Sequence, residues 1–214
     1  MLSFKEIPEI KVILLGETGV GKTSIIKRYA EDNFDVNESS SIGCSYVDKD
    51  VQIDKKKYKL IIWDTIGQEA YRSISKSFVN EAKIVILIYS VTDQNSFQEL
   101  DFWYNLYTEI LGNDVILGIA GNKSDLYLEQ KVPYEKGKKF ADEKRGIFSE
   151  ISAKENKESI NLFMMDLVKA YVYKGKKDLN ERKNRIKLDR KDIKKNKAGC
   201  CLSKKTEGNN DNDS

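Results

Sequence analysis

The chain has 214 residues, of which 40% are hydrophobic and 33% charged, so it can bury one core and carry a tail. It contains no histidine, which excludes imidazole-based triads, proton shuttles and His-rich metal sites. The three cysteines form no CxxC pair and predict a reducing compartment, and we expect no membrane span, signal peptide or N-myristoylation.

Strands and helices alternate along the chain. Strands are predicted at residues 11–15, 46–53, 58–64, 84–89, 115–122 and 147–151. Helices are predicted at residues 22–30, 69–81, 94–111, 134–144 and 158–173. The polar turn at 54–57 makes its two flanking strands an antiparallel hairpin. Because the apolar residues of the strands are continuous rather than alternating, we expect an α/β fold of three layers, with a doubly wound, mostly parallel six-stranded sheet and one antiparallel edge strand.

Charge is spread unevenly along the sequence. Residues 174–197 hold twelve Lys and Arg against four Asp and Glu, a net charge of +8, whereas residues 1–173 have a net charge of −4. We therefore expect an N-terminal extension at 1–9, one domain at 10–173 and a basic tail at 174–214. Such a tail suits an anionic membrane surface or nucleic acid, or is simply a solvated segment. Its sequence leaves open whether it is helical or disordered.

A phosphate-binding loop follows the first predicted strand. It fits the pattern G-x-x-x-x-G-K-[ST], and the predicted nucleotide ligands here are Gly16, Glu17, Thr18, Gly19, Val20, Gly21, Lys22, Thr23 and Ser24. Glycines let backbone N–H groups face phosphate oxygens, and the next helix adds the positive end of its dipole. Lys22 is expected to reach the β- and γ-phosphates, and the Thr23 hydroxyl to bind Mg²⁺. A chance glycine-rich turn is the alternative, and the flanking strand and helix argue against it.

Two later motifs indicate guanine as the base. Asn122, Lys123 and Asp125 form an N-K-x-D motif at the end of one strand, and Ser152, Ala153 and Lys154 follow the next strand. Both motifs lie at carboxyl ends of parallel strands, where such sheets bind ligands. The Asp125 carboxylate can accept hydrogen bonds from N1–H and the 2-amino group of guanine, which adenine does not offer as a pair. Asn122 can join this pocket to the phosphate loop, and the Ala153 N–H can donate to guanine O6.

Together the motifs resemble those of the Ras superfamily of small GTPases, and most closely the Rab family. The similarity runs from about Ile10 to Tyr173 and includes W-D-T-I-G-Q-E at 63–69. It implies the small G domain fold of P-loop NTPases, Mg²⁺-dependent binding of GTP and GDP, and GTP hydrolysis. It also implies a switch in membrane and vesicle trafficking that cycles between the cytoplasm and the cytosolic face of intracellular membranes. Its implied partners are effectors, an exchange factor and a GTPase-activating protein, and we expect a monomer.

The resemblance also assigns roles to single residues. Asp64 would hold Mg²⁺ through a water, and Ser41 would close on Mg²⁺ and the γ-phosphate. Lys22, Gly67 and Gln68 would be the catalytic residues, with the Gly67 N–H on the γ-phosphate and Gln68 orienting the attacking water. Phe34 would pack on the base. The expected effector-binding residues are Ile42, Gly43, Tyr46, Trp63 and Phe78, of which the last three have the spacing of the Rab aromatic triad. For Trp63, ordinary strand packing is the alternative.

Two departures from the family pattern bear on hydrolysis. Ser41 replaces the usual threonine, which predicts a less populated closed switch in the GTP state. Ile66 replaces the usual alanine beside the γ-phosphate, where a larger β-branched side chain crowds the site or stiffens its hinge. The first switch, the segment around Ser41, contains no arginine that could stabilise the transition state in cis, so we expect slow intrinsic hydrolysis. The alternative is a hydrolysis-deficient, nucleotide-bound module that recruits partners without cycling.

A third departure concerns lipid attachment. Rab proteins usually end in or near a double cysteine that is prenylated, but here Cys200 and Cys201 precede 13 further residues. An unmodified pair, prenylation and palmitoylation all stay open, and two chains beside a basic segment would anchor the protein stably. A GTPase associated with nucleic acid is disfavoured, because residues 174–197 contain no aromatic side chain for base stacking.

Overall fold

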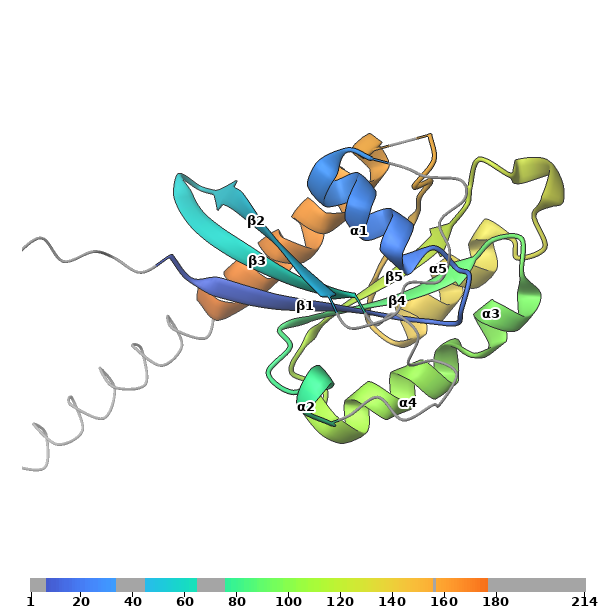
Figure 1. The fold of residues 1–214 in the computed structure, drawn as a ribbon. Helices are drawn as coiled ribbons and strands as arrows, with labels where there is room; N and C mark the ends of the chain where they lie inside the picture. The colour runs from blue at the N-terminus through green and yellow to red at the C-terminus, as the bar shows by residue number, and fades with distance from the viewer. Residues whose placement is uncertain (1–6, 34–44, 65–75, 156, 177–214) are drawn as a thin grey trace, which may run out of the picture. The chain divides into compact units, whose positions relative to one another are not determined.

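The computed structural model describes residues 7–33, 45–64, 76–155 and 157–176. Its strands are β1 Glu9–Leu15, β2 Ser45–Ile53, β3 Lys56–Asp64, β4 Ile84–Ser90, β5 Ile116–Asn122 and β6 Ile147–Glu150. They form one six-stranded sheet in the order β2-β3-β1-β4-β5-β6 (Figure 1). β2 is antiparallel to β3, and every other pair is parallel. The expected fold class, with its single antiparallel edge strand, is therefore confirmed.

The helices cover both faces of this sheet. They are α1 Lys22–Glu31, α2 Lys76–Val79, α3 Gln94–Gln98, α4 Leu100–Leu111, α5 Tyr134–Glu143 and a final helix that begins at residue 157. In Figure 1, α1 lies on the opposite side of the sheet from α2 and α4. Every residue of β4 is buried, as a central strand with helices on both faces requires.

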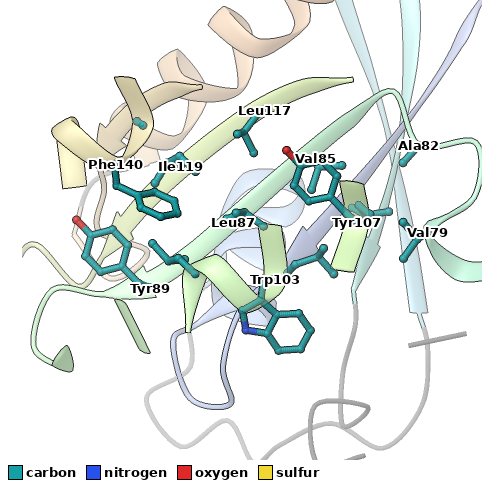
Figure 2. Close-up of a cluster of buried hydrophobic side chains, with 14 of the residues drawn as sticks. Val79, Ala82, Val85, Leu87, Tyr89, Trp103, Tyr107, Leu117, Ile119 and Phe140 are labelled. Carbon is teal, nitrogen blue, oxygen red and sulfur yellow. The ribbon is translucent and has the colours of Figure 1, made fainter. Parts of the chain in front are cut away.

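The side chains of β4 alternate between two apolar layers. On one face Val85, Leu87 and Tyr89 join Trp103 of α4 and Phe140 of α5 in a single buried cluster, part of which Figure 2 shows. On the other face the final helix comes so close to β5 that a Cβ on Gly118 would lie 2.9 Å from side-chain atoms of Leu167 and Phe163. These two layers hold the strands in place and so fix where their carboxyl ends meet.

The β2–β3 hairpin closes with a tighter turn than expected. Ile53 pairs with Lys56, so the turn consists of Asp54 and Lys55 rather than the predicted four residues. Both turn residues have left-handed backbone, with φ of 49° and 64°. Such angles suit a two-residue hairpin turn of the type that usually contains glycine or asparagine, and they match the right-handed twist of the strands. The expectation of a 54–57 turn failed because lysine at a left-handed position gives no sequence signal.

Two predicted helices need correction, and one short helical turn was not predicted. The helix predicted at 94–111 is split at Glu99, whose φ of −72° and ψ of −6° interrupt the regular α-helix between α3 and α4. Of the helix predicted at 69–81, the described part is only Lys76–Val79, and Glu81 has a left-handed φ of 65° that ends it early. A 3₁₀ turn at Tyr127–Glu129, absent from the prediction, follows the N-K-x-D motif.

The chain divides into two structural units, Met1–Tyr171 and Val172–Ser214. In the first unit, helical residues 157–171 bury Ile160, Phe163 and Leu167, whereas Tyr171 is half-buried. Of the second unit the structure describes residues 172–176, which are helical. None of the described helices has the length and apolar character needed to cross a membrane.

Candidate nucleotide-binding site

The loop between β1 and α1 has the backbone of a phosphate cradle. Gly16 has a φ of 150°, and a Cβ on it would lie 2.2 Å from the carbonyl oxygen of Ile88. Gly21 has a φ of 95°, and a Cβ there would lie 2.3 Å from Nδ2 of Asn122. Glycine is therefore required at both ends of the loop, because any side chain would collide with a neighbouring strand's end.

Lys22 lies across this loop with its ammonium group held in place. The residue is 6% exposed, and Nζ donates to the carbonyl oxygens of Gly16 and Glu17, each at 2.9 Å. Lys22 is also the first residue of α1, and the preceding Gly21 supplies no side-chain cap for the helix. Uncapped N–H groups, a helix dipole and a fixed cation all favour an anionic ligand at this point.

Asn122 joins the phosphate loop to the loop at residues 152–154. It ends β5, is 2% exposed, and donates from Nδ2 to the Val20 carbonyl at 2.8 Å. Its Oδ1 accepts from the Ala153 N–H at 3.2 Å. One buried side chain thus fixes the spacing between two loops that are far apart in sequence, as we expected from the motif.

Asp125 and the loop at 152–154 are also connected directly. The Ser152 hydroxyl donates to Oδ1 of Asp125 at 2.6 Å and accepts from the Glu155 N–H at 3.0 Å. Within the N-K-x-D motif, the Ser124 N–H donates to the Ile151 carbonyl at 3.2 Å, and Lys123 adopts a left-handed φ of 67°. The structure therefore brings the N-K-x-D motif and the 152–154 segment together at the carboxyl ends of β5 and β6.

Arg28 of α1 is a contact that our sequence reasoning did not assign to the site. Its Nε donates to the Ala153 carbonyl at 2.7 Å, and its Nη2 donates to the Lys154 carbonyl at 2.8 Å. The guanidinium also pairs with Asp32 at 3.5 Å, and Lys157 pairs with the same carboxylate at 2.9 Å. The hydrogen bond from Lys157 holds the pKa of Asp32 below its usual range, so Asp32 stays an anionic partner for both cations.

The donor set for Mg²⁺ fits the chemistry of that ion. Thr23 follows the phosphate loop, and Asp64, 3% exposed, ends β3 on the strand beside β1. A hydroxyl and a carboxylate are hard oxygen donors of the kind that Mg²⁺ selects, with substrate phosphates completing its coordination. The third predicted ligand, Ser41, lies outside the described residues.

The three predicted partner-reading aromatics are in contact. The rings of Tyr46 and Trp63 lie 5.3 Å apart, and those of Trp63 and Phe78 lie 5.5 Å apart at 90°. Tyr46 is 60% exposed, whereas Phe78 is buried, so the triad presents only one edge to solvent. Lys11 places Nζ 5.0 Å from the Trp63 ring centre, and burial lowers the pKa of this amine while Glu81 opposes the shift. A groove of about 430 Å³ continues from Trp63 along these charged side chains.

Several predicted site residues lie outside the described residues. They are Phe34, Ser41, Ile42, Gly43, Gly67, Gln68, Cys200 and Cys201, together with the substituted Ile66. Their assigned roles therefore stay predictions.

The fold and the loop between β1 and α1 define a P-loop protein with a mostly parallel sheet. Comparison with known proteins gives the family. The sequence profile of the Ras family matches residues 11–172. The Ras-related protein Rab-22A of Canis lupus familiaris is 38% identical over 159 residues, which cover 74% of this chain and 81% of the relative. The Ras-related protein Rab-31 of Mus musculus is 39% identical over 148 residues, which cover 69% of this chain and 76% of the relative.

The chain belongs to the Ras family of small GTPases, and it is Rab-like. This confirms the resemblance drawn from the sequence motifs and the assignment as a GTPase. The family binds guanine nucleotides, and its Rab members act in vesicle transport on intracellular membranes.

Proposed function

We propose that this GTPase binds GTP and GDP with Mg²⁺, hydrolyses GTP slowly, and acts as a switch at a cytosolic membrane surface. The observation that supports it best is the buried side chain of Asn122, which hydrogen-bonds the phosphate loop on one side and the 152–154 loop on the other. A nucleotide that fills this site has its phosphates beside Lys22 and its base beside Asp125.

Guanine specificity rests on Asp125. The carboxylate is held by the Ser152 hydroxyl at 2.6 Å, which leaves its other oxygen to accept from the base. Guanine supplies N1–H and the 2-amino group as donors, whereas adenine leaves the carboxylate short of a partner in a closed pocket. We therefore expect selective binding of GTP and GDP over ATP and ADP.

Catalysis in this site is mainly positioning and charge stabilisation. Lys22 brings a fixed positive charge to the phosphates, and the N–H groups at the start of α1 add the helix dipole. Mg²⁺, when bound by Thr23 and Asp64, supplies charge neutralisation at the phosphate oxygens. Gln68 orients the attacking water, and Gly67 donates its N–H to the γ-phosphate. We expect hydrolysis to be slow because no arginine of the first switch contributes.

Single-turnover hydrolysis tests this proposal. Purified protein is loaded with GTP and Mg²⁺, and phosphate release is followed beside a Gln68→Leu variant. We expect slow release by the wild type and none by the variant. If tightly held GTP is never hydrolysed by the wild type, the switch cycle is refuted, and the chain is a locked module that recruits partners without cycling.

The aromatic triad is the proposed surface for effectors that recognise the GTP form. Tyr46 is the member most exposed to solvent, so its removal changes the surface with little effect on the core. Tyr46→Ala is expected to lower capture of effectors by the GTP-loaded chain, whereas Tyr134→Ala, another half-exposed tyrosine, is not. Equal capture by both variants would rule out Tyr46 as an anchor.

The basic tail and its cysteines are the proposed membrane contact. The net charge of +8 at 174–197 is attracted to anionic lipid, and lipid on Cys200 and Cys201 would make the attachment stable. Mass spectrometry of the protein from its native cell tests the modification. Unmodified Cys200 and Cys201 would refute lipid anchoring while leaving the nucleotide cycle unaffected.

A further inference from the structure

The C-terminal turn of α1 reaches the base-reading end of the site through one arginine. Arg28 is 18% exposed at its side chain and spends two of its donors on consecutive backbone carbonyls, those of Ala153 and Lys154, at 2.7 and 2.8 Å. The two partners lie 125 and 126 residues away in sequence. A planar guanidinium that binds two adjacent carbonyls restrains both the position and the tilt of the peptide between them.

The peptide restrained in this way belongs to the loop that faces the base. The Ala153 N–H, whose bond to Asn122 Oδ1 is 3.2 Å long, is the group we expect to donate to guanine O6. The Ser152 hydroxyl of the same loop donates to Oδ1 of Asp125. Asp125 reads N1–H and the 2-amino group, which lie next to O6 on the same edge of the base. It belongs to the loop after β5, which the Ser124 N–H joins to the Ile151 carbonyl. Arg28 binds the two residues after Ser152, so it is placed to align the O6 donor directly, whereas it reaches Asp125 only through Ser152.

The guanidinium is itself oriented from a third direction. Asp32 pairs with Nη1 at 3.5 Å, while Nε and Nη2 face the loop. Asp32 ends α1 in a left-handed conformation, with φ of 60°, and is shared with Lys157 of the final helix. The arginine therefore has a fixed rotamer, and its two loop contacts need little further ordering.

We propose that Arg28 is a positioning residue for guanine recognition, which sets the rate of nucleotide release by aligning the 152–154 backbone with O6. This rests on the proposed function, because it takes the bound ligand to be a guanine nucleotide. The arginine does not touch the base. It acts through the peptide of Ala153 and Lys154, and its contribution should depend on whether the base carries an oxygen at C6.

The test compares two ligands on the full chain. Wild type and Arg28→Gln are loaded with GDP or with 6-thioguanosine diphosphate, which keeps N1–H and the 2-amino group and replaces O6 by sulfur, a weak hydrogen-bond acceptor. Dissociation is timed after a chase with excess GTP and Mg²⁺. We expect Arg28→Gln to release GDP at least tenfold faster, which corresponds to 1.4 kcal/mol. Release of the 6-thioguanosine nucleotide by Arg28→Gln should stay within twofold of the wild type's release of the same nucleotide.

Two further variants sharpen the comparison. Arg28→Lys keeps the charge near Asp32 and reaches fewer carbonyls, so its GDP release should be intermediate. Arg145→Gln removes the same charge at the opposite end of β6, at the turn before Ile147, and should release GDP at the wild-type rate.

Each outcome decides a separate claim. Equal acceleration of both nucleotides by Arg28→Gln would reduce Arg28 to a general structural contact and overturn the inference. Unchanged GDP release would overturn it as well. A wild type that retains neither nucleotide would instead refute the proposed function, and the inference with it.

Discussion

Removing one buried oxygen from the core should stabilise this protein. Tyr89 of β4 is fully buried, and its hydroxyl has no hydrogen-bond partner among the residues that the structure describes. The hydroxyl lies where two glycines approach it, since a Cβ on Gly137 or Gly121 would lie 2.3 or 2.7 Å from that oxygen. The ring itself is well packed, with the Phe97 ring 5.1 Å away at 73°. The substitution Tyr89→Phe keeps this packing and removes only the unpaired polar atom.

The magnitude follows from two opposing effects. A buried hydroxyl without a partner costs about 1–3 kcal/mol relative to its hydration in the unfolded chain. The void left by one oxygen, roughly 10 Å³, costs roughly 0.2 kcal/mol at about 24 cal/mol per Å³. We therefore expect Tyr89→Phe to raise the free energy of unfolding by about 1–2 kcal/mol. For a domain of this size that corresponds to a rise in Tm of roughly 3–6 °C.

Chemical and thermal denaturation of the GDP-loaded protein measure this change, with nucleotide and Mg²⁺ held constant because a ligand shifts the apparent stability. Tyr107→Phe is the matched control: its ring is also buried, and its hydroxyl is not among the unpartnered buried groups. We expect no gain from this control. A loss of 1 kcal/mol or more in Tyr89→Phe would show that the hydroxyl is bonded in solution and refute the reasoning.

Three more predictions concern Asn122, the glycines of the phosphate loop and Tyr29. Asn122→Ala leaves the Val20 carbonyl and the Ala153 N–H without this partner, so the free energy of unfolding in urea should fall by about 2–4 kcal/mol. GDP release should be at least tenfold faster, and a fall below 1 kcal/mol would contradict the prediction. In Gly16→Ala the new Cβ would lie 2.2 Å from a carbonyl oxygen, so the free energy of unfolding should fall by about 3 kcal/mol or more. In Gly19→Ala nothing lies within 4 Å of the Cβ, so only left-handed backbone strain of about 1–2 kcal/mol is expected. Equal losses in the two variants would contradict the steric clash. Burial raises the pKa of Tyr29 to about 12, so as the pH rises this tyrosine ionises first in the unfolded chain. The free energy of unfolding should therefore fall between about pH 10 and 12 by up to about 1.4 kcal/mol per pH unit. Tyr29→Phe should lose less stability over this range, and an unchanged pH profile would exclude Tyr29 as the cause.

Much of the fold was predictable because its signals are local. Six consecutive apolar residues begin β4, and such a run is enough to predict a strand buried on both faces. The phosphate loop was predictable from the spacing of its glycines between a strand and a helix, although the contacts that require Gly16 and Gly21 come from Ile88 and Asn122, far along the chain. The hairpin turn of Asp54 and Lys55 was not, because either residue is ordinary in a loop and only the pairing of Ile53 with Lys56 shows that two residues suffice.

The split between α3 and α4 shows another limit of local signals. The sequence from 94 to 111 is apolar at helical spacing throughout, so one continuous helix was the natural expectation. In the structure, Asp93 caps the first turn by accepting from the Asn95 N–H, and Ser96 hydrogen-bonds both the Asp93 carbonyl and the Ser90 N–H. These bonds tie the short α3 to the end of β4. The direction of α4 is set instead by Trp103 and Tyr107, which are buried in the core. A bend at Glu99 reconciles the two requirements.

The role of Asn122 could be predicted from a sequence motif, whereas the role of Arg28 could be seen only in the structure. Both are single side chains that fix the 152–154 loop, and both reach it across a large sequence separation. Asn122 was predictable because it lies in a short pattern whose other members bind the same ligand. Arg28 belongs to none of the nucleotide-binding motifs, and an arginine near the C-terminus of a helix already has a sufficient reason in the helix dipole. Its contacts with Ala153 and Lys154 become visible only when the order of strands places α1 beside the loop that follows β6. The residues that orient a binding loop are for this reason harder to predict than those that touch the ligand, and measurements of nucleotide release are the way to find them.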